Sequence, residues 1–360
     1  MRFSTAALLV ASLLGGHARA AEEETRPWSL DLTIHDFGIG IGNSRHIDGL
    51  RLNVRDTAPF VAHGVNATVW TPSKEAADSE VDGLALGLPV TGAGRVRGLA
   101  IGLGVGATET LDGVSAGVLG LGSGGGLRGV HLAGLGAGTG GNVVGIAAGG
   151  LGVGAGGNVY GLLAGGLGAG AGGNLTGIGV GGLGIGAGGR ARGVFAGGLG
   201  VGAGGDLDGI AVGGLGVGAG EGVQGIVLAG LGAGAGGDVQ GLLAGGLAAG
   251  AGGTIQGVAI AGLGVGAPRI QGLAVGLAVG GKEVQGVVVA PAYFHLAAGG
   301  RLEGVSVSAF NRVLGEQRGL AIGLLNYASR LHGVQIGLVN WADNNPAGLK
   351  VLPVANAHFE

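Results

Sequence analysis

The sequence predicts an all-β protein built as a β-solenoid, and three observations support this fold class. One short unit recurs along almost the whole chain, as in NVYGLLAGGLGAGAGG from Asn158 onward. Within each unit, apolar residues alternate with glycine at a period of two, which is typical of β-strands. The unit is also far shorter than the thirty or more residues of a helical-pair repeat. We therefore expect one coil of chain per unit, with two short strands joined by glycine corners.

An anchor glycine marks each unit, preceded by an apolar and then a polar residue and followed by an apolar–any–apolar triplet. Anchors lie 16 residues apart from Gly113 to Gly257 and mostly 14 or 15 apart elsewhere, with wider spacings of 19 after Gly64 and 18 after Gly286. These spacings predict a β-solenoid of about twenty short turns of 14–19 residues. The anchors are Gly49, Gly64, Gly83, Gly98, Gly113, Gly129, Gly145, Gly161, Gly177, Gly193, Gly209, Gly225, Gly241, Gly257, Gly272, Gly286, Gly304, Gly319, Gly333 and Gly348.

The repeat also predicts which side chains point inward. We expect the apolar residues to fill the interior of the coil, including Ile210, Val212 and Leu215, with a corner at the glycine pair 213–214 where the alternation changes phase. The polar residue before most anchors predicts a polar row along one outer face. Five consecutive members of that row are glutamines able to form an amide ladder: Gln224, Gln240, Gln256, Gln271 and Gln285.

Four segments are predicted along the chain. Residues 1–20 form a secretory signal peptide, with positively charged Arg2, a short apolar run and the cleavage sequence Ala18-Arg19-Ala20. Residues 21–45 form an N-terminal cap strand, residues 46–343 the glycine-rich β repeat array, and residues 344–360 a C-terminal cap. Most aromatic residues lie near the two ends, so we expect aromatic-rich end caps that cover the terminal turns.

Composition excludes several classes of protein. The chain of 360 residues holds 94 glycines, yet it has neither the triplet period of collagen nor enough proline for a flexible linker. With a net charge of −3, only 11% charged residues and no basic stripe, nucleic acid is not expected as a partner. The absence of cysteine excludes disulfides and thiolate metal sites.

No residue is predicted to carry catalysis, to bind a cofactor or to bind a metal. Lys282 ends a glycine-rich stretch like a P-loop, but Glu283 stands where serine or threonine is required. Asp206 and Asp208 do not repeat as the carboxylate ladder of a calcium-binding β-roll would. The eight histidines show no ligand spacing. The binding position therefore stays unknown, and the aromatic insertion at residues 291–295 is the first place to look.

Two C-terminal segments carry a family resemblance. GLAIGLLN at residues 319–326 and GVQIGLVN at residues 333–340 resemble the GLQIGLxN units of bacterial cell-envelope surface-repeat proteins. The likeness extends over roughly residues 28–359 and weakens in the middle, where Gly or Ala replaces the Gln and Asn frequent in that family. It implies an exported envelope protein of a Gram-negative bacterium, and it brings no catalytic residues.

These observations predict a non-enzymatic structural or surface-binding repeat protein, exported to the periplasm, outer membrane or cell surface. Its envelope or surface ligand, its oligomeric state and any association with the membrane are left open. The alternative is an integral β-barrel or closed radial β assembly with apolar residues facing lipid. A third reading is an enzyme that uses the coil as a platform. That reading needs carboxylates projecting together from neighbouring turns, and only Asp206 with Asp208 comes near it.

Overall fold

The computed structural model describes residues 28–359, so the predicted signal peptide lies outside the described residues. The expected fold class is confirmed. The chain is all-β, with 76% of residues in strands arranged as a β-solenoid of about 18 turns spaced by about 16 residues. Among the described residues there is one 3₁₀ turn, η1 (Lys74–Ala76), which lies within the 19-residue spacing between Gly64 and Gly83. The chain divides into two compact units at Gly182 and Leu183.

The described part of the first unit, residues 28–182, contains twelve strands and η1. Its strands are β1 (Ser29–Ile34), β2 (Phe37–Gly42), β3 (His46–Asn53), β4 (Val61–Thr68), β5 (Glu80–Ser123), β6 (Gly126–Ala133), β7 (Gly136–Thr139), β8 (Asn142–Gly149), β9 (Gly152–Ala155), β10 (Val159–Gly165), β11 (Gly168–Ala171) and β12 (Leu175–Gly181). Strand β5 is 44 residues long and runs through three anchors without a break.

The second unit contains fifteen strands. They are β13 (Gly184–Ala187), β14 (Ala191–Gly197), β15 (Gly200–Ala203), β16 (Leu207–Gly213), β17 (Gly216–Ala219), β18 (Val223–Ala229), β19 (Gly232–Ala235), β20 (Val239–Gly245), β21 (Ala248–Ala251), β22 (Thr254–Ala261), β23 (Gly264–Gly266), β24 (Arg269–Val275), β25 (Ala278–Ile322), β26 (Leu325–Ala342) and β27 (Val351–His358).

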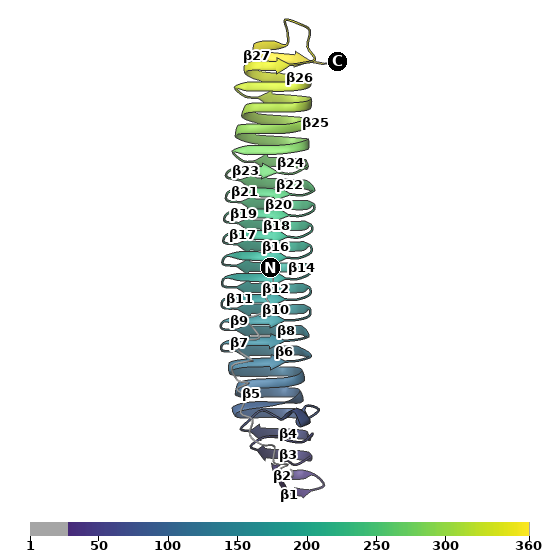
Figure 1. Cartoon of the computed structure of the whole chain (residues 1–360), viewed down its shortest axis with the longest axis vertical. Helices are drawn as coiled ribbons and strands as arrows, with labels where there is room; N and C mark the ends of the chain where they lie inside the picture. The colour runs from purple at the N-terminus through teal and green to yellow at the C-terminus, as the bar shows by residue number, and fades with distance from the viewer. Residues whose placement is uncertain (1–27, 360) are drawn as a thin grey trace. The chain divides into compact units, whose positions relative to one another are not determined.

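Successive turns pair in parallel and in register. In the second unit, β16, β18, β20 and β22 form one stack, while β17, β19, β21 and β23 form another (Figure 1). Anchor glycines face one another across the first stack, Gly209 to Gly225 to Gly241. Residues at the same place in the unit are therefore neighbours in space. This parallel order excludes the alternative in which consecutive units run in opposite directions around a closed sheet.

All twenty anchor glycines adopt positive φ, between +97° and +155°. Gly225 illustrates the reason. Its φ is +132°, and a Cβ added there would lie 2.1 Å from the carbonyl oxygen of Gly209 in the preceding turn. Only glycine accepts this backbone conformation without strain. The anchors found from their flanking residues are thus points at which any side chain would be strained.

The predicted assignment of side chains to inside and outside was wrong in part. Val217 and Ala219 are buried as expected, but Ile210, Val212 and Leu215 are all exposed. Inward and outward side chains alternate through the anchor without a change of phase. The polar residue before the anchor points outward, so the first and third residues after the anchor point outward as well. The second residue after the anchor, read as unconstrained, faces the core.

The core row at that second position changes character along the chain. In the central turns it holds apolar residues such as Leu163, Phe195 and Val227, all buried. Near the N-terminal end of the first unit the same row holds Arg51 and Asn66, both fully buried.

Asparagine supplies the polar contacts near the C-terminal end of the second unit. Asn311 donates to Asn326, and Asn326 donates to Asn340, each across 2.7 Å within the core. The asparagines of the GLxN segments are therefore internal hydrogen-bonding residues.

Asparagine or aspartate three residues before the anchor closes one corner of the turn. Its side-chain oxygen accepts a hydrogen bond from the backbone N–H sixteen residues later. Asn142 accepts in this way from Asn158 at 2.7 Å, and Asp238 from Thr254 at 2.6 Å. Such bonds satisfy backbone donors that the strands leave unpaired at the corner.

Each outer end is covered by an antiparallel pairing. Strand β1 pairs with β2 in the first unit, and β27 pairs with β26 in the second. The expected covering by aromatic side chains is wrong for the outermost residues, because Trp28, Phe37 and Phe359 are largely exposed. Backbone hydrogen bonds satisfy the terminal edges directly, which large side chains cannot do.

His131 is a fully buried histidine in the core row, between Ser115 and Ala147 of the adjacent turns. Burial lowers its pKa below the usual 6.5, and the nearby Arg128 backbone and Asp112 carboxylate oppose that shift only in part. The unfolded chain therefore takes up the proton at a higher pH than the folded chain.

The contribution of neutral His131 to the free energy of unfolding should be fully present above about pH 6.5. Below that value it should decrease as the pH falls, by at most about 1.4 kcal/mol per pH unit. Comparing melting temperatures at pH 7.5 and pH 5.5 in the native chain and in His131→Leu tests this. The variant should lose less stability on acidification. An equal loss in both proteins would contradict the assignment.

Candidate functional site

A ladder of exposed leucines lies six residues after each anchor from Gly113 to Gly257. In the second unit each residue of this Leu ladder is between 46% and 56% exposed, and from Leu199 to Leu263 each backbone N–H donates to the carbonyl of the leucine one turn earlier at 2.6–2.8 Å. The side chains therefore stand directly above one another. Its members are Leu183, Leu199, Leu215, Leu231, Leu247 and Leu263; in the first unit Leu119, Leu135, Leu151 and Leu167 hold the same place.

Two further apolar rows lie on the strand that precedes this corner. They occupy the first and third positions after the anchor, as Ile210 and Val212 do in β16 and Ile226 and Leu228 do in β18. All four side chains are exposed. We call these two rows and the Leu ladder together the apolar face. Soluble monomers rarely expose contiguous apolar surface beyond a few hundred Å².

Charged residues are scarce in the turns that carry this face. Residues 129–189 contain no Asp, Glu, Lys or Arg, and residues 222–268 contain only Asp238. The outward positions of the second strand of each turn are glycines, as at Gly216 and Gly218 in β17. A surface designed to stay in water would carry roughly a quarter to a third charged residues.

The polar row before the anchors exists as expected, but its glutamines do not form an amide ladder. Gln224, Gln240 and Gln256 are register partners, yet no side-chain hydrogen bond joins them in the described chain. Ion pairs between adjacent turns are the main contacts of this row. Arg192 contacts Asp208 at 3.1 Å, and in the first unit Arg97 contacts Asp82 at 3.3 Å.

Asp206 and Asp208 are committed to structural contacts. Asp206 accepts hydrogen bonds from the Gly222 backbone at 3.0 Å and from the Arg190 guanidinium at 2.6 Å. These two contacts, the backbone one first, lower the pKa of the Asp206 carboxyl. Asp208 is paired with Arg192. Neither carboxylate is placed to serve as a catalytic acid or base.

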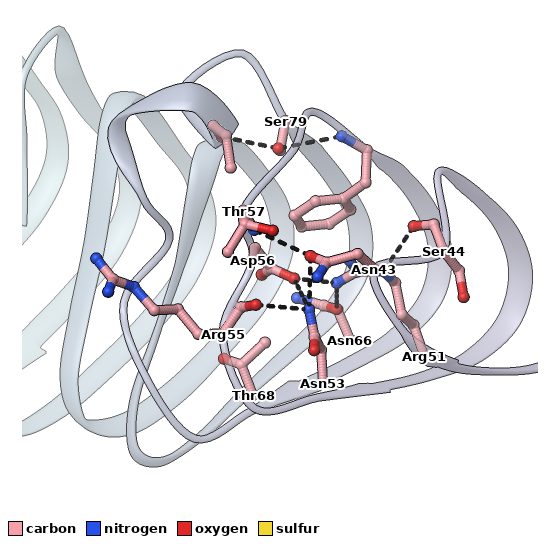
Figure 2. A network of polar contacts seen from close by, with 12 residues as sticks. Asn43, Ser44, Arg51, Asn53, Arg55, Asp56, Thr57, Asn66, Thr68 and Ser79 are labelled. Carbon is pink, nitrogen blue, oxygen red and sulfur yellow. Dashed lines mark hydrogen bonds and ion pairs between the residues drawn. The ribbon is translucent and has the colours of Figure 1, made fainter. Parts of the chain in front are cut away.

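A buried polar network joins strands β3 and β4 of the first unit, as Figure 2 shows. The Arg51 guanidinium donates to Asp56 at 2.6 Å and to Asn66 at 3.0 Å, and its plane lies 3.8 Å from the centre of the Phe60 ring. Asn53 donates to the same Asp56 oxygen at 2.6 Å. A buried ion pair with such hydrogen bonds holds neighbouring turns in one register.

An open, mainly apolar groove of about 600 Å³ lies beside this network. Its lining includes Trp28 and the exposed Leu88, together with Asn43, Asn53 and Thr68. Asn43 and Asn53 both line the groove and form hydrogen bonds in the polar network. The groove therefore belongs to the turns at the N-terminal end of the first unit.

The insertion at residues 291–295 is mainly structural. Phe294 is fully buried, and Tyr293 stacks on His295 with a contact of 3.2 Å between the hydroxyl and Nδ1. Lys282, at the end of the stretch that resembles a P-loop, is exposed but lies in strand β25 rather than in a turn.

Sequence reasoning missed one cluster of chemically active side chains. His46, Asp48 and His63 each offer a ligand atom, and these atoms lie within 4.8 Å of one another on the outer surface of the first unit. Nothing in the spacing of the histidines along the chain singles out His46 or His63. The signal was the register, since Asp48 and His63 both directly precede an anchor and therefore become neighbours across adjacent turns.

No family model, no curated protein and no solved structure matches this sequence. Within residues 28–359, none of the helical structure is long and apolar enough to cross a membrane.

Proposed function

We propose that this protein is a non-enzymatic structural repeat protein, exported to the bacterial envelope, whose copies associate side by side through the apolar face. The observation that carries the proposal is the Leu ladder, in which one exposed leucine is stacked on the next in turn after turn. A folded protein gains nothing internally from leucines in this position. Their regular exposure indicates a surface that another molecule covers.

The energy available from covering this face is large enough for association. A half-exposed leucine retains about 1 kcal/mol of transfer free energy, so the six leucines of the second unit offer on the order of 6 kcal/mol. The two neighbouring apolar rows offer a comparable amount. Together these contributions are of the same order as the roughly 4–15 kcal/mol that association costs in lost translational and rotational freedom.

A second copy of the chain fits this face better than other partners. The leucines repeat at the spacing between paired strands, about 4.8 Å, and another β-solenoid presents apolar side chains at the same spacing. Two such faces can interdigitate along many turns with no charge left buried. A lipid surface is less favoured, because interfacial binding usually relies on several basic residues beside the apolar ones, whereas residues 129–268 contain only Arg190 and Arg192, each paired with an aspartate.

Sedimentation velocity of the chain without residues 1–20 tests the proposal. The native protein should sediment as a dimer or larger assembly at micromolar concentration. The triple variant Leu199→Glu/Leu215→Glu/Leu231→Glu should be monomeric with an unchanged far-UV circular dichroism spectrum. The matched control Gln224→Glu/Gln240→Glu/Gln256→Glu adds the same three charges on the polar row and should still associate.

Other results would contradict the proposal. A monomeric native protein at high concentration, or an assembly that the leucine variant leaves intact, would show that the face does not join copies. If the monomer instead floats with vesicles of zwitterionic lipid, and the leucine variant does not, the face binds membranes. Export is checked separately, by sequencing the N-terminus of the mature protein for cleavage after Ala20.

A further inference from the structure

We propose that His46, Asp48 and His63 form a surface site for a divalent transition-metal ion such as Zn²⁺. The site is independent of the apolar face. It lies on the outer surface of strands β3 and β4, where none of the three side chains takes part in the buried network around Arg51.

Parallel register brings the three residues together. Asp48 and His63 are direct partners across β3 and β4, and His46 lies two residues before Asp48 on the same outward side of β3. Partners in adjacent strands are about 4.8 Å apart, and residues two apart in a strand are about 6.6 Å apart. Paired backbones thus fix the Cα positions, and only the side chains need to adjust to an ion.

The distances between ligand atoms suit a single ion. Asp48 Oδ1 lies 2.7 Å from His63 Nδ1 and 3.8 Å from His46 Nε2. The two imidazole rings meet edge to face, with centroids 5.5 Å apart. Zinc bonds of about 2.0–2.2 Å in a tetrahedron place ligand atoms roughly 3.4 Å apart. Rotations about exposed side-chain bonds are sufficient to reach that spacing, since the three side chains are 42–49% exposed.

The ligand chemistry selects the class of ion. Two imidazole nitrogens and one carboxylate oxygen suit Zn²⁺, Ni²⁺ or Co²⁺, whereas Ca²⁺ and Mg²⁺ require mainly oxygen ligands. With three protein ligands, the remaining coordination positions would hold water.

Asp82 of the next turn is a neighbour rather than a fourth ligand. Its carboxylate is paired with Arg97 at 3.3 Å, and Oδ2 lies 3.9 Å from His63 Nε2. It can accept a hydrogen bond from that nitrogen while Nδ1 holds the ion. Carboxylates in this position orient a ligating histidine and strengthen its binding. An alternating row of charges, Asp48–His63–Asp82–Arg97, would explain the positions of Asp48 and His63 without a metal ion, but it would not explain His46.

Isothermal titration of the tag-free chain with ZnCl₂ tests the site. We expect the native chain to bind one ion. The affinity for Zn²⁺ should be lower by about tenfold or more in each of His46→Ala and His63→Ala. The matched control His35→Asn removes a histidine from the same end of the chain and should bind as the native protein does. Visible absorption of bound Co²⁺ should appear in the native chain and disappear in the double variant His46→Ala/His63→Ala.

Three outcomes would overturn the proposal. They are the absence of Zn²⁺ and Co²⁺ binding, unchanged binding in the double variant, and displacement of the ion by excess Ca²⁺. A circular dichroism spectrum recorded for each variant separates loss of the site from loss of the fold.

Discussion

Gly225→Ala is expected to destabilise the second unit by about 3 kcal/mol or more. The φ of +132° is unfavourable for alanine, and the added Cβ would lie 2.1 Å from the backbone oxygen of Gly209. That oxygen belongs to a paired strand, so it cannot move without breaking hydrogen bonds between turns. Chemical denaturation, combined with hydrogen exchange of β16 and β18, measures the loss.

Gly218→Ala is the matched control, seven residues away in β17. No heavy atom lies within 4 Å of the Cβ position there, and the backbone is outside the positive-φ region. Glycine in a strand costs roughly 0.5–1 kcal/mol relative to alanine, so this variant should be as stable as the native chain or slightly more stable. Equal destabilisation by both substitutions would show that the anchors have no special role.

Val217→Asp is expected to cost about 4 kcal/mol or more, because it leaves a carboxylate in the core with no partner. Val217 is 4% exposed, and its register partners Val201 and Ala233 are also buried. Neither partner can donate a hydrogen bond from its side chain. Loss of the thermal transition, or a large fall in its midpoint, is the expected observation.

Leu215→Asp makes the same kind of change two residues earlier, at a side chain that is 48% exposed. At concentrations too low for copies to associate, it should cost about 1 kcal/mol or less, since the carboxylate stays in water. Similar melting temperatures for the two aspartate variants would mean that the interior and the apolar face have been interchanged.

The fold could be predicted from the sequence because each turn repeats the same local requirements. Positive φ at every anchor demands glycine, and period-two alternation demands strands, so the pattern of residues around each glycine located all twenty anchors. The glycine load is explained only in part by these demands. Gly225 and Gly214 stand where a Cβ would collide with backbone, whereas Gly218 and Gly202 face open space.

The orientation of the side chains could not be predicted by hydrophobicity. Leu215, Ile226 and Leu228 are apolar but outward, while Arg51 and Asn326 are polar but inward. Assigning every apolar residue to the core therefore gave the wrong orientation for three rows, although alternation from the polar row would have given the correct one for the two rows on the strand. The histidine cluster was missed because its members become adjacent only through the register of turns, which no short motif reveals.

The polar cores of the outermost turns have a consequence for how such a chain can change its size. In the central turns each copy meets a near-identical copy, so removing residues 226–241 would join Gly225 to Leu242 and reproduce the register found elsewhere. Arg51 bonds to Asn66 of the next turn, and no other described turn holds a buried arginine. Removal of one whole copy is therefore expected to preserve the contacts between turns in the middle of the chain and to break this polar pair in the first turns.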